Sequence, residues 1–337
     1  MFAMNKLAAP FTFVDGRHFW PELSVQSIAQ RAPTKHSSEC PALSAKAAAF
    51  ASASISASTR RAYQGDLEDF LIWGGGIPSS PFKLAEYVAE RAAVHSPITI
   101  SRRLVGISRA HTCQGLADPA KSDIVKAVVR GLRKSNGTPQ RQAAPVLRED
   151  LLPMLAQMRG VKGIRDRALI LVGFAAALRR SELVALDVNA IQFVPEGLLV
   201  QLFRSKTDQN GEGRKIAIPY GRTSACPVKA LKNWLDVSGT TSGPVFRSVN
   251  KTGAIACSRL TDQSVSQIVK QYAAIIGLPA QAYSGHSLRA GLVTSAAKAG
   301  VSFAKIQQQT GHRSSAMLIR YIRDASIFEN NAAGLLL

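Results

Sequence analysis

The chain has 337 residues, of which 46% are hydrophobic, so it is long enough for two domains with separate cores. Its 42 Lys and Arg residues against 22 Asp and Glu give a net charge of +20, an excess that favours a polyanionic partner. The four cysteines form no CxxC pair, and the longest apolar run, residues 168–178, is too short to cross a bilayer. Composition thus argues against a zinc site, a disulfide framework and a membrane protein, and favours a reducing cytoplasm.

The first part of the chain predicts a helical domain. Residues 1–54 end in an Ala/Ser-rich stretch, and we expect a mobile segment there with at most some helix. Helical patterns then follow, opened by Ser, Thr or Pro, and they predict a compact all-helical domain over residues 55–134. The segment 135–145, SNGTPQRQAAP, contains Gly, Pro and polar residues without periodicity and therefore predicts a linker.

The second part, residues 146–337, predicts a mixed domain. A long apolar helix runs up to residue 178, and three short β-rich runs come after it, which predict a small antiparallel sheet. A polar, Gly-containing hairpin tip, residues 205–213, separates the last two runs. Helical patterns then resume at 225–236, 260–276, 286–300, 302–311 and 313–323. The predicted fold class is mainly α: a helical domain followed by an α+β domain and a C-terminal tail.

The stretch ALRRSELVAL places Arg179 directly after the buried apolar helix. An arginine at such a position needs a carboxylate partner or an anionic ligand. Glu182 lies three residues on and on the same helical face, so it can be a structural partner or can orient Arg179 toward a phosphate. Both interpretations are compatible.

Three further stretches carry polar residues that each have a simple structural explanation. GHSLRAG places His286 and Arg289 on one face at a helix start, where anions bind, although a capping histidine and a solvent arginine also fit. Lys206 stands where a strand enters the hairpin, as a surface lysine would. TGHRSSAMLIRYIRDAS carries His312 and Tyr321 on an amphipathic stretch, where a half-buried aromatic is common.

Together these residues suit phosphodiester chemistry. Arginines bind phosphate oxygens in pairs and stabilise the extra negative charge of a five-coordinate transition state. A tyrosine can attack to give a covalent ester, and a lysine can protonate the leaving oxygen. The sequence shows no carboxylate cluster of the kind that holds two Mg²⁺ ions, so we expect neither a metal nor another cofactor.

The order of these motifs resembles the tyrosine recombinase (phage integrase) family. ALRRSELVAL matches the family's first arginine box, GHSLRAG its H-x-x-R box and TGHRSSAMLIRYIR its L-G-H…Y box, while SKTDQ falls at its β-hairpin lysine. The stretch STRRAYQGDLEDFLIW is typical of the family's helical core-binding (SAM-like) domain. The resemblance spans roughly residues 55–325, and the motifs in this order are highly specific.

The resemblance implies a site-specific recombinase that cleaves and rejoins duplex DNA at a specific target site, for integration, excision or resolution of a mobile element or replicon. Tyr321 would form the 3′-phosphotyrosyl link, Lys206 would be the general acid and His286 would assist proton transfer. The non-bridging phosphate oxygens would be held by Arg179, Arg289 and His312.

The resemblance also implies a nucleoid-associated protein that is a tetramer on two synapsed sites and a monomer or weak oligomer without DNA. Weaker candidates for DNA contact are Arg60, Arg61, Arg102, Arg103 and Arg109. Two alternatives remain open from the sequence. One is a nicking and resealing enzyme like a type IB topoisomerase, and the other is a DNA-binding regulator with a silent site.

Overall fold

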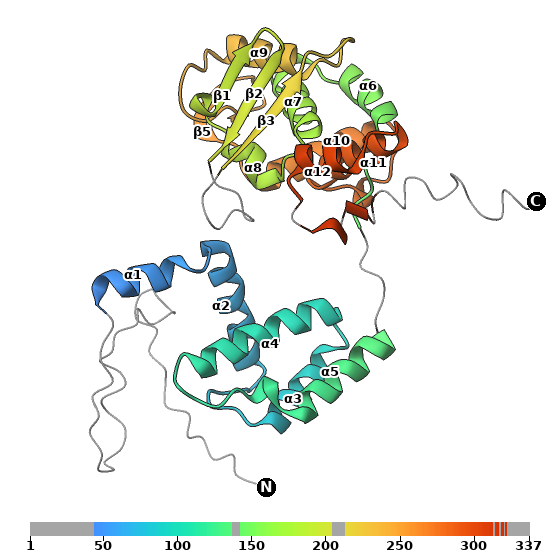
Figure 1. Cartoon of the computed structure of the whole chain (residues 1–337). Coiled ribbons are helices and arrows are strands. Elements are labelled where there is room, and N and C mark those ends of the chain that lie inside the picture. The colour runs from blue at the N-terminus through green and yellow to red at the C-terminus, as the bar shows by residue number, and fades with distance from the viewer. Residues whose placement is uncertain are drawn as a thin grey trace, which may run out of the picture. The chain divides into compact units, whose positions relative to one another are not determined.

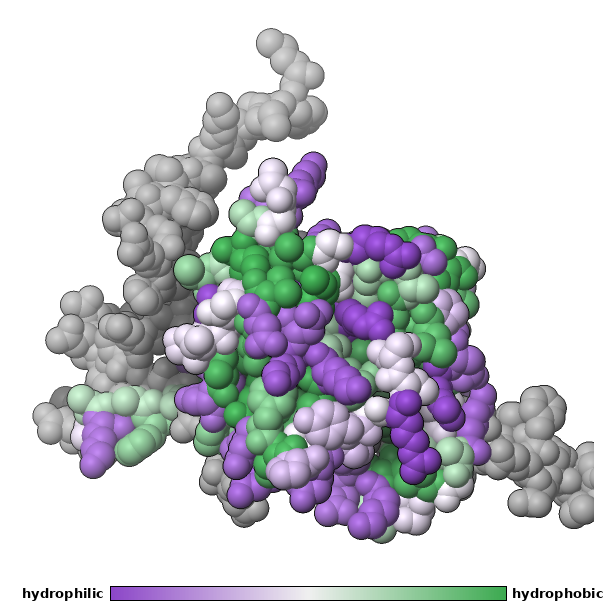
Figure 2. Space-filling view, turned by 90° about the horizontal axis from the view of Figure 1, so that it is seen from above, coloured by the Kyte–Doolittle hydropathy of each residue, from purple (hydrophilic) through white to green (hydrophobic). Residues whose placement is uncertain are grey.

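The computed structural model describes residues 44–136, 142–203, 213–312, 314–316, 318–319 and 321. The chain divides into two compact units, residues 1–140 and residues 141–337, each with its own hydrophobic core (Figure 1). In these described ranges, no helix is long and apolar enough to cross a membrane. Figure 2 shows hydrophilic side chains interspersed with smaller hydrophobic patches over one face of the molecule.

The first unit is all-helical in its described part, as predicted, and serine side chains cap the starts of three of its helices. Ser56, Ser80 and Ser96 each accept a hydrogen bond from the backbone N–H three residues on, which caps a helix start. Pro81 and Pro97 occupy first helical positions. The helices are α1 (Ala45–Ala53), α2 (Ala57–Ile72), α3 (Pro81–Arg91), α4 (Pro97–Thr112) and α5 (Asp123–Asn136).

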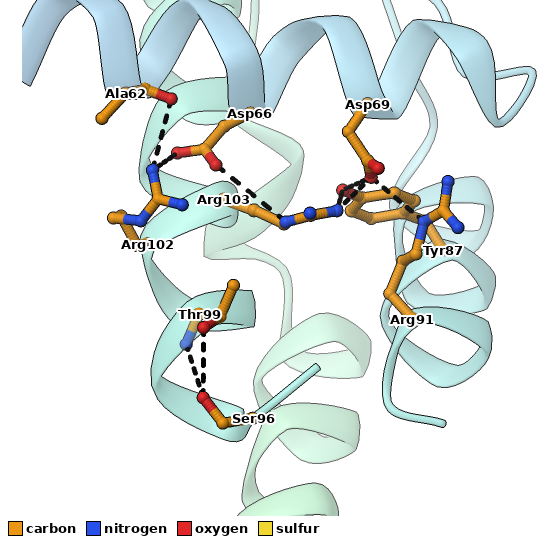
Figure 3. A network of polar contacts seen from close by, with 9 residues as sticks. All are labelled: Ala62, Asp66, Asp69, Tyr87, Arg91, Ser96, Thr99, Arg102 and Arg103. Atoms are coloured by element: carbon orange, nitrogen blue, oxygen red, sulfur yellow. Dashed lines mark hydrogen bonds and ion pairs between the residues drawn. The ribbon is translucent and has the colours of Figure 1, made fainter. Parts of the chain in front are cut away.

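Carboxylates on α2 tie this helix to α3 and α4 (Figure 3). Asp66 is 3% exposed and pairs with Arg102 at 2.6 Å, while Asp69 pairs with Arg103 and with Arg91. Burial raises the pKa of Asp66, an effect that the two neighbouring arginines oppose. Removing one partner of such a network leaves a buried charge uncompensated, so the network specifies how these helices pack.

The second unit combines helices with two small antiparallel sheets. β1 (Ile191–Val194), β2 (Gly197–Leu202) and β3 (Arg214–Pro219) form the predicted three-stranded sheet in the order β1-β2-β3. β4 (Arg247–Val249) and β5 (Ile255–Arg259) form a second hairpin that the sequence patterns did not predict. The helices are α6 (Arg148–Ala156), α7 (Gly160–Ala175), α8 (Arg180–Ala185), α9 (Pro227–Ser238), α10 (Asp262–Ile275), α11 (Ser287–Lys298) and α12 (Phe303–Thr310).

Helix α7 lies at the centre of this unit and carries a buried ion pair between two of its own neighbouring residues. Arg165 Nη2 lies 2.6 Å from Asp166 Oδ1, and the two side chains are 4% and 0% exposed. The Tyr272 hydroxyl on α10 donates to the other carboxylate oxygen at 3.1 Å, and burial raises the pKa of Asp166. The remaining buried face of α7 is apolar, with Leu169, Ile170 and Val172 in the core. A hydrogen bond to α10 and apolar packing therefore hold α7 in the core, and its C-terminal end leads into the turn before α8.

The structure adds detail at the ends of the predicted segments. Within the segment 1–54, for which the sequence allowed some helix, α1 covers Ala45–Ala53. At the two ends of the predicted linker, α5 continues to Asn136, and the Ala144 N–H donates to the Ala282 carbonyl at 2.8 Å, while residues 137–141 lie outside the described residues. The expected helix over 313–323 lies partly outside the described residues, although Ser315, Ala316, Leu318, Ile319 and Tyr321 are helical.

Candidate active site

The turn between α7 and α8 contributes two groups to the candidate site, the carbonyl of Ala177 and the guanidinium of Arg179. Ala177 takes a φ of +49°, a left-handed conformation that is rare for a residue with a Cβ atom. Two residues later, Arg179 is the N-cap residue of α8. Its backbone N–H donates to Glu182 Oε2 at 2.9 Å, and its guanidinium pairs with the other oxygen of that carboxylate. The buried Glu182 therefore orients Arg179 as the helix begins.

Arg289 on α11 is 6% exposed and meets this turn. Its Nη1 donates to the Ala177 carbonyl at 2.7 Å, and its Nε faces His312 Nε2 at 3.4 Å. Its Nη2 is buried and has no hydrogen-bond partner among the described residues. Burial, followed by the nearby Arg179, lowers the pKa of Arg289 to about 10, so it stays charged at neutral pH. A buried guanidinium with an unused donor is costly unless an anion binds it.

His312 is held in one tautomer by the end of α12. Gly311 closes this helix in the left-handed conformation. The Thr310 hydroxyl donates to the Ile306 carbonyl at 2.8 Å, so its oxygen accepts the proton from His312 Nδ1 at 2.7 Å. His312 Nε2 is then the unprotonated nitrogen, which accepts from Arg289. Burial, followed by Arg289, Arg179 and Arg214, lowers the pKa of His312 to about 4.

This environment predicts that His312 stays neutral from pH 5 to pH 8 in the DNA-free protein. The pKa of His312 in the folded protein, about 4, lies below its unfolded value of about 6.5. Between these two pH values the unfolded chain therefore binds more protons than the folded protein. The contribution of His312 to stability is therefore complete above the unfolded pKa and is lost as the pH falls toward 4. Ring ¹⁵N NMR over pH 5–8 should show a constant neutral signal for His312, and a titration midpoint near 6.5 would contradict this placement.

His286 and Tyr321 lie at the edges of the same unit. His286 is exposed and directly precedes α11, and its backbone N–H donates to Ser284 Oγ at 3.1 Å. The Tyr321 ring is half-buried against Val293, Ile306 and Leu318. The negative charge of an ionised Tyr321 would raise the pKa of Arg289, so the two residues lie within electrostatic range of each other. Lys206 lies outside the described residues.

Arg214, at the start of β3, is a member of this cluster that the sequence motifs did not include. Its Nη1 donates to the Gln309 carbonyl at 3.1 Å, and its charge acts on Arg289 and His312. The sequence did contain a signal. Residues that alternate along a strand share a face, and Ile216 and Ile218, which come after Arg214 at this spacing, are buried. Extending the alternation one step places Arg214 on the inner face.

The arginines predicted to contact DNA lie on α2 and α4 of the helical unit. Arg103 is 11% exposed and pairs with Asp66 and Asp69, so the network of Figure 3 gives it a structural role. Arg102 also pairs with Asp66 but is 45% exposed, and Arg109 lies over the Tyr63 ring at 5.8 Å. Arg61 is exposed and Arg60 is half-buried. Exposure thus favours Arg61 and Arg102 over Arg103 as DNA contacts.

Among the described residues, Glu182 pairs with Arg179 and its charge also acts on Arg214 and Arg289, so three guanidiniums stand against one carboxylate around a neutral His312. Across the described ranges, no three His, Cys, Asp or Glu side chains gather as a metal site would require. Such a cation cluster suits a class of protein that binds phosphate, and the tyrosine on the neighbouring helical segment is a side chain of a type that can attack phosphorus.

Comparison with known proteins agrees with this class, and the chain belongs to the phage integrase family, whose model matches residues 146–326. It is 39% identical over 285 residues to an integrase/recombinase XerD homologue of Selenomonas ruminantium, covering 81% of this chain and 84% of the relative. It is 28% identical over 269 residues to the Cre recombinase of Escherichia phage P1, covering 74% and 77%. The resemblance to tyrosine recombinases is therefore confirmed.

Solved structures share the fold at low sequence identity. A lambda integrase dimer bound to a COC′ core site matches with a TM-score of 0.56 at 16% identity, covering 82% of this chain and 74% of that one. The XerH site-specific recombinase bound to a palindromic difH substrate matches with a TM-score of 0.54 at 19% identity, covering 75% and 70%. The predicted fold class, mainly α with a small antiparallel sheet, is confirmed.

Proposed function

We propose that the protein is a site-specific DNA recombinase that cleaves and rejoins duplex DNA through a 3′-phosphotyrosyl intermediate. The observation that carries this proposal is Arg289, a charged, buried guanidinium whose Nη2 has no partner among the described residues. A phosphodiester supplies both the negative charge and the acceptor oxygens that this group lacks. The names of the relatives, an integrase/recombinase and a recombinase, support the same activity.

In this proposal the cations bind the scissile phosphate. Arg179 and Arg289 donate to its non-bridging oxygens and stabilise the charge that develops as phosphorus becomes five-coordinate. His312 can donate to such an oxygen only with a proton on Nε2. The negative charge of DNA favours that proton, because it offsets the arginines that lower the pKa of His312.

The covalent step forms one bond and breaks one. Tyr321 Oη attacks phosphorus and gives up its proton with the assistance of His286, while the bond from phosphorus to the 5′ oxygen breaks and Lys206 protonates that oxygen. The new phosphotyrosyl ester conserves the energy of the broken bond. A 5′-hydroxyl from a partner strand can therefore reverse the step without ATP, which permits strand exchange.

Exchange between two duplexes needs more than one active chain. We propose a tetramer on two synapsed sites in the nucleoid, with the chain a monomer or weak oligomer without DNA. Phosphate contacts from the helical unit, with Arg60, Arg61, Arg102 and Arg109 as the candidates, would hold each duplex. Such contacts position a protein on DNA but do not themselves read the sequence.

A covalent selection from random DNA tests this function, because it needs no target sequence to be chosen in advance. The protein is incubated with random-sequence duplexes in excess EDTA and quenched with detergent, and the DNA that remains attached to protein is sequenced. Because guanidiniums supply the charge stabilisation, we expect adducts in EDTA that converge on one inverted-repeat site. Adducts that form only after Mg²⁺ is restored would contradict the metal-free mechanism, and the absence of any adduct would contradict the proposed activity.

A further inference from the structure

The side chain of Arg214 crosses from the sheet to the end of α12. The residue begins β3, and its half-buried side chain reaches the C-terminal turn of α12, where Nη1 donates to the Gln309 carbonyl at 3.1 Å. Carbonyls at a helix C-terminus are unpaired within the helix and carry partial negative charge, so they hold a guanidinium well. One nitrogen of Arg214 is thereby anchored two residues before Gly311 and three before His312.

Gly311 makes room for this guanidinium. A Cβ atom at position 311 would lie 2.7 Å from Arg214 Cζ and 3.0 Å from Nε, closer than atoms can pack. Gly311 also has a φ of +63°, in which a side chain is strained. The glycine in front of His312 therefore serves two purposes: it ends α12, and it lets the Arg214 guanidinium lie against the backbone beside His312.

The charges around Arg214 are those of the candidate site. Glu182 and Arg179 both act on it, and its own charge acts on Arg289 and on His312. Burial lowers the pKa of Arg214, and among the described residues the carboxylate that acts on its charge is that of Glu182. Glu182 is already hydrogen-bonded to Arg179 through both of its oxygens. An incoming anion would balance the excess positive charge of Arg179, Arg214 and Arg289.

We propose that Arg214 is a further phosphate-binding residue of the site, anchored through Nη1 on α12 and contributing its guanidinium charge to the scissile phosphate beside His312. This inference rests on the proposed function. The alternative is that Arg214 only fastens β3 to α12. If Arg214 balances phosphate charge, its loss should slow cleavage less when the scissile phosphate is replaced by an uncharged group. If it only fastens β3 to α12, its loss should slow cleavage of the charged and the uncharged DNA by the same factor.

The test compares Arg214→Gln with the unaltered protein on two duplexes that carry the selected target site. One has a normal scissile phosphodiester, and the other has a methylphosphonate there, in which a methyl group replaces one charged oxygen. We expect Arg214→Gln to slow cleavage of the normal duplex by roughly 10²-fold, as for loss of one oxyanion donor. On the methylphosphonate, relative to the unaltered protein, the loss should be less than about 10-fold, because little charge remains to be balanced.

Arg259→Gln is the matched control. Arg259 Nη1 also donates to backbone carbonyls at a helix end, those of Val184 at 2.6 Å and Leu186 at 3.3 Å, but its guanidinium pairs with Asp187 rather than with the cation cluster. Its substitution should change cleavage of both duplexes by the same factor.

The outcomes separate this inference from the function on which it rests. If the unaltered protein forms no adduct with the normal duplex, the proposed function is wrong. If it does, and Arg214→Gln loses the same factor on both duplexes while its circular dichroism is unchanged, Arg214 is a fastening residue and the inference is overturned. Arg214→Lys keeps the positive charge but loses the planar guanidinium with its paired N–H donors. It should cleave the normal duplex faster than Arg214→Gln.

Discussion

Tyr321→Phe should abolish the covalent protein–DNA complex while leaving DNA binding intact. The ring of Tyr321 is half-buried against Val293, Ile306 and Leu318, and phenylalanine preserves that packing. Only the hydroxyl is lost, and it is the proposed nucleophile. A gel shift should show unchanged affinity for the selected site, whereas detergent-resistant adduct should be undetectable.

One control variant keeps this result specific to the hydroxyl. Tyr283→Phe removes a phenol from a buried tyrosine that lies on no motif of the site, and it should leave adduct formation unchanged. Adduct that persists in Tyr321→Phe would mean that another residue attacks. Loss of binding in that variant would instead indicate that the phenol has a structural role, which the packing does not predict.

Arg289→Met should be the most damaging substitution of a residue that does not itself form the covalent bond. Methionine fills much of the buried space but removes the donor to the Ala177 carbonyl, the contact with His312 and the unused Nη2. Removing one oxyanion donor typically costs about 10²–10³-fold in rate, and Arg289 supplies more than one interaction, so we expect a loss at or above that range.

The stability of Arg289→Met distinguishes this functional role from a structural one. Loss of an excess buried cation offsets the unpaired Ala177 carbonyl, so the free energy of unfolding should change by no more than about 2 kcal/mol. Arg165→Met is the matched control. It leaves the buried Asp166 carboxylate without its ion-pair partner and should destabilise the protein by about 3–5 kcal/mol. Urea unfolding measures both, and a large loss of stability in Arg289→Met would assign that residue to the fold.

The sequence predicted most of the helices and the main sheet because their signals are local. Serine caps and Pro at the first helical position mark the starts of α3 and α4, and alternation marks β3. The hairpin of β4 and β5 was missed because its strands are short and almost wholly part-exposed or exposed, which leaves no alternation to detect.

The motif residues of the site could be selected from the sequence, but the contacts between them could not be predicted from it. The positive φ of Ala177, which aims its carbonyl at Arg289, leaves no trace in an Ala-rich helix end. The tautomer of His312 depends on a hydroxyl two residues earlier, Thr310, and on how α12 ends. The structural pairing of Arg103 depends on α2 and α4 packing together, which is a tertiary effect.

The most direct test of the central claim is to identify the atom that becomes attached to DNA. Adduct formed in EDTA on the selected site is digested with nuclease and protease, and the modified peptide is sequenced by mass spectrometry. The proposed mechanism predicts a nucleotide joined through its 3′-phosphate to Tyr321 and a free 5′-hydroxyl on the released strand. Attachment to any other residue, or linkage through a 5′-phosphate, would contradict it.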